Sequence, residues 1–272
     1  MQKITKVLTM LCLLVTCVAY AETSNLATQT GKDIGLTLAY YQYEEPRLMS
    51  LKGAKIGLDF SATKAWQNEQ FIRAELRSAY GRLNYNSYGT GSVSGEPDWY
   101  IEARGMMGKD WSYNNDVIAA YIGLGYRYLF NDGRGATSSG ALGYRRKSSY
   151  VYLPIGIIYR SNYDARAKLV TTLEYDHFLI GRQISKLSDI GLGLGDVRNS
   201  QRSGYGLKLS IQYEKDRLSF GPYLNSWNID RSNWMPLYQY GLPVFDSGGF
   251  QLGGVEPQND TIELGLKVSQ KF

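Results

Sequence analysis

The amino-acid sequence predicts an all-β fold: a transmembrane antiparallel up-and-down β-barrel of about ten strands, with a range of about eight to twelve. Three observations predict it. Apolar residues recur at every second position along the chain, not at the helical period. Most of these segments are about ten residues long, as a tilted membrane-crossing strand requires, whereas strands of soluble proteins have about five or six. After the N-terminal region, no apolar stretch is long enough for a transmembrane helix.

The N-terminus has the three parts of a secretory signal peptide. Lys3 and Lys6 give a positive start, residues 7–18 are apolar or small, and Ala19-Tyr20-Ala21 matches a cleavage site. The apolar run is shorter than the about 20 residues of a membrane anchor helix. We therefore expect a cleaved signal peptide at 1–21 and a barrel domain at 22–272. A lipoprotein anchored at Cys17 is the alternative, but Thr16 fits a lipobox poorly.

The composition excludes several classes of protein. Both cysteines, Cys12 and Cys17, lie in the predicted signal, so the exported chain has no disulfide, Cys nucleophile or Cys-bound metal. Removing Lys3 and Lys6 from 30 basic residues leaves 28 against 25 acidic ones, a net charge of +3. That balance predicts no nucleic-acid partner. The 23 tyrosines suit the aromatic belts at the two membrane surfaces.

Ten segments carry the period-2 alternation. In chain order they are 34–41, 54–60, 72–78, 99–107, 118–128, 151–160, 168–176, 205–214, 218–227 and 262–272. The ninth contains Pro222, which cannot donate to a ladder, and the pattern does not fix its register. An even number of strands places both termini on one side of the membrane, which we take as the periplasmic side.

The connections are expected to alternate between long outer loops and short inner turns. The predicted outer loops are 44–52, 81–97, 131–148, 178–203 and 230–257, and the predicted inner turns are 61–69, 108–116, 161–165 and 215–216. Four aromatic residues of the last outer loop, Trp234, Tyr238, Tyr240 and Phe245, are expected to fold over the barrel mouth. Contact with a partner is the alternative.

The last strand carries a family resemblance. Leu264, Leu266 and Val268 alternate with polar or small residues before a C-terminal Phe272. This pattern resembles the assembly signal of Gram-negative outer-membrane β-barrel proteins of the small porin-like kind. Gln270 departs from the apolar outer face. The resemblance implies an outer-membrane location after signal-peptide export, contact with outer-membrane lipid and lipopolysaccharide, and recognition of the last strand by the barrel-assembly machinery.

The inward positions gather charges of both signs, and buried charges must pair because an unpaired one costs several kcal/mol. The lumen residues predicted to form this core are Arg73, Glu75, Arg77, Glu102, Arg104, Arg127, Arg160, Lys168, Glu174, Asp176, Lys208 and Glu214. Barrels of about eight strands are filled by side chains, and open channels appear at about 16. We therefore expect a filled or narrowly hydrated lumen, in which Gly123, Gly125 and Gly156 leave some room.

These observations favour a structural or surface-interaction role, with an extracellular partner that the sequence does not identify. A narrow, weakly anion-preferring solute channel is the alternative. A hydrolase is the third hypothesis, with His177 as the base, but Asp176 and His177 are adjacent and point to opposite faces of a strand. We therefore predict no enzymatic activity, no catalytic residue, no metal site and no cofactor.

Overall fold

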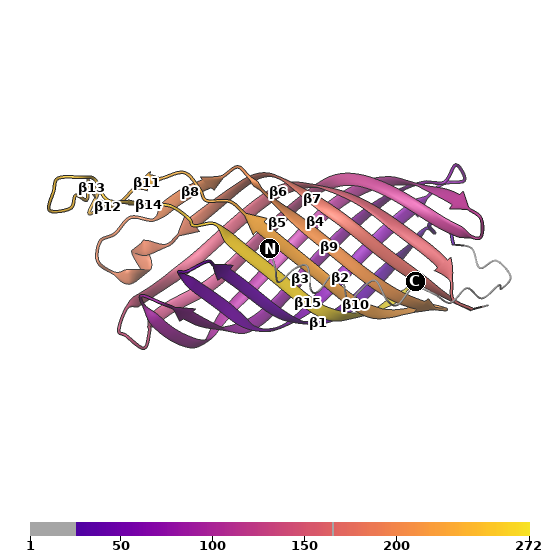
Figure 1. Cartoon of the computed structure of the whole chain (residues 1–272), viewed down its shortest axis with the longest axis horizontal. Helices are drawn as coiled ribbons and strands as arrows, with labels where there is room; N and C mark the ends of the chain where they lie inside the picture. The colour runs from indigo at the N-terminus through magenta and orange to yellow at the C-terminus, as the bar shows by residue number, and fades with distance from the viewer. Residues whose placement is uncertain (1–25, 165) are drawn as a thin grey trace.

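The computed structural model describes residues 26–164 and 166–272, so the predicted signal peptide lies outside the described residues. Ten long antiparallel strands form a closed barrel, with β1 next to β15 and β6 paired with β7 (Figure 1). The barrel strands are β1 (Gly31–Glu45), β2 (Met49–Ala65), β3 (Gln70–Ser87), β4 (Gly91–Tyr113), β5 (Asp116–Ala136), β6 (Leu142–Asn162), β7 (Ala167–Ser185), β9 (Gly204–Lys215), β10 (Leu218–Ile229) and β15 (Asn259–Lys271). The predicted all-β barrel of ten strands is confirmed.

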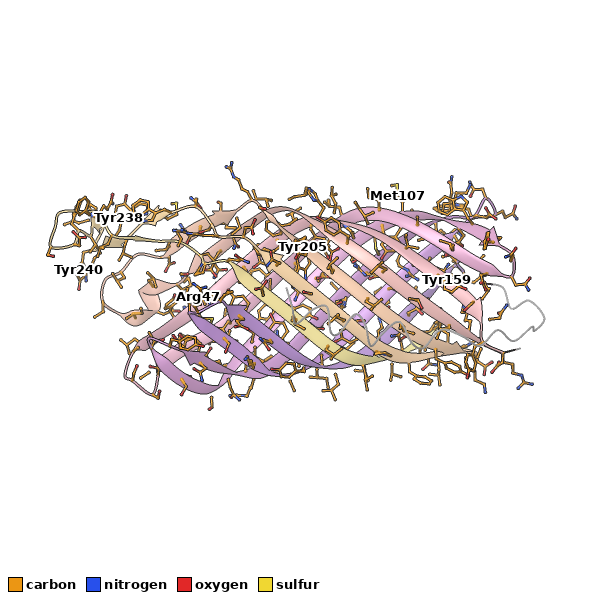
Figure 2. All side chains as sticks on the ribbon, viewed as in Figure 1. Arg47, Met107, Tyr159, Tyr205, Tyr238 and Tyr240 are labelled. Atoms are coloured by element: carbon orange, nitrogen blue, oxygen red, sulfur yellow. The ribbon has the colours of Figure 1, made fainter. Side chains whose placement is uncertain are left out.

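The strand faces follow the predicted alternation. Leu38 is 63% exposed on the outer surface, while its neighbour Ala39 is 5% exposed and faces inward. The same holds for Met107, Tyr159 and Tyr205, which lie on the outside of the wall in Figure 2. A lipid-facing wall explains this inverted arrangement, because the outside of such a barrel meets hydrocarbon and not water. No helix in the described part of the chain is long and apolar enough to span a bilayer.

The strands are longer than predicted. The connections at 46–48, 88–90 and 137–141 are tight, because most of the segments predicted as loops 44–52, 81–97 and 131–148 belong to hairpin strands. The prediction of long loops at 81–97 and 131–148 was therefore wrong. Beyond the apolar band the outward residues become polar, so the alternation fades, while ladder pairs such as Tyr85↔Val93 continue.

The two ends of the barrel differ. We call the end with Gly31 and Phe272 the terminal end, and it has short turns at 66–69, 114–115 and 216–217. The opposite end, the loop end, carries a 3-10 helix η1 (Leu187–Ile190) and β8 (Val197–Gln201), which extends the sheet along β7. It also carries β11 (Met235–Pro236), β12 (Tyr238–Gln239), β13 (Leu242–Pro243) and β14 (Gly253–Gly254). Figure 1 shows these four short strands reaching beyond the barrel wall.

Candidate functional site

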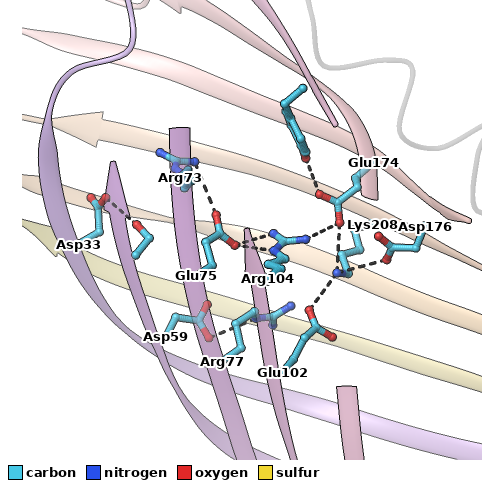
Figure 3. A network of polar contacts seen from close by, with 12 residues as sticks. Asp33, Asp59, Arg73, Glu75, Arg77, Glu102, Arg104, Glu174, Asp176 and Lys208 are labelled. Atoms are coloured by element: carbon cyan, nitrogen blue, oxygen red, sulfur yellow. Dashed lines mark hydrogen bonds and ion pairs between the residues drawn. The ribbon is translucent and has the colours of Figure 1, made fainter. Parts of the chain in front are cut away.

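All twelve predicted lumen residues lie on the inward side of their strands, and each takes part in an ion pair. Six of them form a chain of alternating charge through the lumen, and Figure 3 labels all of them except Arg127. Its members, in order of contact, are Glu75, Arg104, Glu174, Lys208, Glu102 and Arg127. The Arg104 guanidinium lies 2.6 Å from Glu75 and 2.5 Å from Glu174.

The remaining predicted lumen residues extend from this chain. Arg73 lies 3.7 Å from Glu75, and Arg77 pairs with Asp59 at 3.2 Å. The other pairs are Arg160 with Asp110, Lys168 with Glu214, and Lys208 with Asp176. The charges therefore compensate one another across several strands.

A layer of buried side chains crosses the lumen between its two ends. We call it the plug layer, and its members are Tyr41, Lys55, Tyr100, Glu102, Arg127, Tyr152, Lys208, Trp227 and Glu263, each at most 7% exposed. The Lys208 ammonium from β9 lies 3.0 Å from Glu102 on β4. Tyr100 on β4 donates to Glu263 on β15 at 2.9 Å. These partners are four strands apart in the barrel order, so the contacts cross the lumen.

Cations in the plug layer also stack on aromatic rings. The Arg127 guanidinium carbon lies 4.1 Å from the Tyr100 ring centre, and the Lys55 ammonium lies 3.5 Å from that of Tyr41. Such contacts stabilise a desolvated cation. Trp227 was missed by sequence analysis, because Pro222 left the register of β10 open. The outward residues Leu218 and Phe220 would have indicated it, since they place odd-numbered positions inside.

The inner glycines do not leave open space, contrary to expectation. A Cβ on Gly125 would lie 2.2 Å from the ring of Tyr152, and one on Gly156 would lie 2.3 Å from the ring of Tyr121. In each case the glycine pairs with that tyrosine on the neighbouring strand. The ring of each tyrosine packs directly against the backbone of its glycine, in the space that a side chain would occupy. Gly123 is similarly crowded by Met106.

Between the plug layer and the terminal end lies a cavity of about 390 Å³. Its rim includes Thr28, Asp33, Asp216 and Phe272, and its deep end includes Arg77, Arg104 and Lys208. Thr28 belongs to a short segment that enters the mouth, where its backbone amide and hydroxyl donate to Asp110 at 2.5 and 2.9 Å. The cavity is thus open toward the terminal end and narrow at the plug layer.

The last loop does not cover the mouth, so the expectation for its aromatic residues was wrong. Residues 234–254, which we call the ribbon, project from the loop end, with Tyr238 and Tyr240 far from the wall in Figure 2. Tyr240 is 80% exposed, and Leu242, Phe245 and Phe250 are exposed as well. The ribbon bonds to the loop that follows η1: Tyr240 donates its backbone amide to Gly193 at 2.8 Å. This contact with the neighbouring loop fixes the direction in which the ribbon projects.

The base of the ribbon is fixed to the barrel wall. The Asn199 amide donates to the carbonyls of Asn233 and Gly254 at 2.8 and 3.1 Å, which joins the two ends of the ribbon to β8. Glu256 accepts from Arg146 at 2.6 Å, and Glu45 accepts from the same guanidinium. Burial raises the pKa of Glu256 to about 7, since its carboxylate has lost solvent.

His177 lies on the outer face of β7, whereas Asp176 is fully buried on the inner face. The two side chains therefore lie on opposite sides of the barrel wall. The imidazole is close to the ring of Tyr175, with 6.3 Å between ring centres. Among residues 26–164 and 166–272, no three His, Cys, Asp or Glu side chains gather as ligands for a metal ion.

The fold is similar to that of known proteins, although the sequence is not. No family model and no curated protein matches the chain. The structure is similar to that of the outer-membrane protease OmpT from Escherichia coli, with a TM-score of 0.62 and 12% identity, over 89% of this chain and 96% of that chain. The chain has the fold of an outer-membrane β-barrel.

Two further solved structures are more distant. An outer-membrane channel from Pseudomonas putida F1 has a TM-score of 0.40 and 13% identity, over 93% of this chain and all of that chain (100%). The transport unit of the autotransporter AIDA-I from Escherichia coli has a TM-score of 0.36 and 10% identity, over 93% and 94% of the two chains. At these identities the likeness concerns the fold, and it transfers neither protease activity nor transport to this chain.

Proposed function

We propose that this chain is a surface-interaction protein of the Gram-negative outer membrane: a barrel with a closed lumen that holds the ribbon outside the cell. The observation that carries the proposal is the plug layer. Its charges are paired across the lumen and its aromatic rings fill the space between them. Opening a continuous water path would displace these rings and separate Glu102 from Arg127 and Lys208.

The ribbon supports the second part of the proposal. Residues 234–254 carry a single charged residue, Asp246, and present Tyr240, Leu242 and Phe250 to solvent. Exposed apolar groups gathered in one segment are typical of interaction sites. Contacts of the ribbon base with β8 and Arg146 keep this surface at a fixed position on the barrel. A partner with an apolar surface fits it best.

The location completes the proposal. Export by the predicted signal peptide, with the terminal end in the periplasm, puts the ribbon outside the cell. The outward residues Leu264, Leu266 and Val268 of the last strand and the neighbouring Phe272 are exposed, which supports recognition of this segment by the barrel-assembly machinery. The outer wall meets outer-membrane lipid and lipopolysaccharide. No catalytic step is part of the proposal.

Conductance of the refolded chain in a planar bilayer tests the closed lumen. We expect a silent membrane at moderate voltage. A Tyr100→Ala/Trp227→Ala double variant is the matched control, because it removes two rings of the plug layer and is expected to give conductance steps. Steady ohmic steps from the unaltered chain would overturn the closed lumen and favour the narrow channel, with the lumen arginines along its path.

Binding of protein-loaded vesicles to polystyrene beads tests the ribbon. We expect the variant Tyr240→Ser/Leu242→Ser/Phe250→Ser to lose most of the binding, because it removes the exposed apolar area of the ribbon. Tyr88→Ser is the control, since Tyr88 is equally accessible in another connection of the loop end. Equal binding by the triple variant and the unaltered chain would contradict the interaction role of the ribbon.

A further inference from the structure

The cavity at the terminal end has an apolar wall, which is unusual inside a charged barrel. Phe71, Met106, Tyr121 and Ile158 form a buried cluster on the adjacent strands β3 to β6, and Val170 on β7 packs against it. These five side chains all line the cavity. An apolar surface that faces a cavity open to water favours a ligand that covers it.

The opposite side of the cavity is basic. Lys267 and Lys271 lie on β15, five strands from Tyr121 on β5 in either direction around the barrel, so the two walls face each other. Their ammonium groups lie 2.7 and 2.6 Å from Asp59 and Glu214. Both lysines stay partly accessible, at 31% and 37% of the side chain.

Basic side chains outnumber acidic ones in the lining of this cavity, by nine Lys and Arg residues against six Asp and Glu residues. Arg77, Arg160 and Lys208 also pair with acids outside the lining, whereas Lys267, Lys271 and Arg73 do not. Two of the acids each pair with two cations: Asp59 pairs with Arg77 and Lys267, and Glu214 pairs with Lys168 and Lys271. Arg73 makes one hydrogen bond, to Thr63 at 2.9 Å, and its nearest carboxylate is 3.7 Å away. These cations retain donors for a further anion.

Both the size and the single opening of the cavity suit binding more than passage. A volume of about 390 Å³ lies in the range of small-molecule sites. The deep end is closed by the chain from Glu75 through Arg104 to Glu174, in which each charge already has a close partner. A ligand entering from the terminal end would meet the apolar wall on one side and the lysines on the other.

We propose that this cavity binds a small amphipathic anion, a molecule with one carboxylate or phosphate group and one apolar group, taken up from the terminal end. The anionic group lies among Lys267, Lys271 and Arg73, and the apolar group lies against Phe71, Met106 and Val170. Charge-assisted hydrogen bonds in a space partly shielded from water give the anion its affinity. This site goes beyond the proposed surface role, from which it is separated by the plug layer.

Equilibrium dialysis with the full chain in lipid nanodiscs tests the site, with empty nanodiscs subtracted. The probe is phenylacetate, compared with the neutral phenylacetamide and with acetate, which lacks the apolar group. We expect both comparison compounds to bind at least about tenfold more weakly, because each meets only one wall. Benzyl phosphate in place of phenylacetate distinguishes a phosphate ligand from a carboxylate ligand. Equal binding of phenylacetate and phenylacetamide would overturn the proposal.

Two variants locate the binding. Lys267→Gln/Lys271→Gln is expected to weaken phenylacetate binding about tenfold or more, and Val170→Phe is expected to weaken it as well, because the larger side chain occupies space at the apolar wall. Lys64→Gln is the control, because Lys64 is exposed on the outer face of β2. Heat-modifiable gel migration checks that each variant is folded. Should the double variant not fold, Lys271→Gln replaces it, since Glu214 keeps Lys168. Unchanged binding in a folded lysine variant refutes the site.

Discussion

Glu102 offers the sharpest test of the ion-pair network inside the lumen. Its carboxylate is fully buried and lies 3.1 Å from Arg127 and 3.0 Å from Lys208. In a Glu102→Gln variant, Lys208 keeps Glu174 and Asp176, whereas Arg127 has no other ion pair among the described residues. The main cost is therefore one buried arginine without a counter-charge. Breaking a buried pair in this way costs about 3–5 kcal/mol, and Gln recovers part of it as a hydrogen bond, which leaves about 3 kcal/mol.

Urea unfolding in lipid vesicles, followed by tryptophan fluorescence, measures this loss. With a slope of about 1–3 kcal/mol per molar urea, the unfolding midpoint falls by roughly 1–3 M. Asp132→Asn is the control. It removes a charge whose partner, Arg134, is 55% exposed, and such a surface pair contributes about 0–1 kcal/mol. A Glu102→Gln midpoint no lower than that of Asp132→Asn would refute the reasoning.

A second substitution separates charge from packing. Adding Arg127→Met to Glu102→Gln removes the unpaired cation while keeping apolar bulk beside Tyr100. We expect the double variant to recover more than half of the lost free energy of unfolding, because replacing both partners of a buried pair is often nearly neutral. If the losses of unfolding free energy caused by Glu102→Gln and Arg127→Met simply add in the double variant, the ion pair between these residues does not stabilise the barrel.

The remaining predictions concern other parts of the barrel. Gly125→Ala should lower the free energy of unfolding by about 1–3 kcal/mol by displacing the Tyr152 ring, whereas Gly105→Ala, where a Cβ meets nothing within 4 Å, should have little effect in the same urea assay. Burial raises the pKa of Glu256 to about 7, above its unfolded value of 4.5, so the folded ribbon base binds an extra proton between these values and loses stability as the pH rises through this window. Protease cleavage of the ribbon should accordingly be faster at pH 8 than at pH 5, and Glu256→Gln should remove that difference; the opposite pH trend would contradict the assignment. His177→Ala should change neither folding nor conductance, and a hydrolase activity lost in that variant would instead support an enzyme.

The number of barrel strands and the faces of most of them followed from the sequence itself, whereas the full length of the strands did not. The alternation of Ile34, Leu36 and Leu38 with small or polar residues is a local pattern. Successive side chains of a strand point to opposite faces, so every second residue is apolar wherever one face of the strand meets lipid. The inward charges follow from the same pattern. Arg73, Glu75 and Arg77 can be assigned to the lumen without knowing which strands lie opposite them.

Only the tertiary structure decided how the lumen is filled. Lys208 and Glu102 are 106 residues apart, and their contact depends on the diameter and stagger of the closed barrel, which no local pattern specifies. The packing of Tyr152 over Gly125 likewise depends on the register between β5 and β6. The direction of the ribbon is set by hydrogen bonds of its base to Asn199 and Arg146, distant in the chain. Which residues face lipid depends on the neighbours of each residue in sequence, whereas the packing of the lumen and the direction of the ribbon depend on contacts that exist only after the barrel has closed.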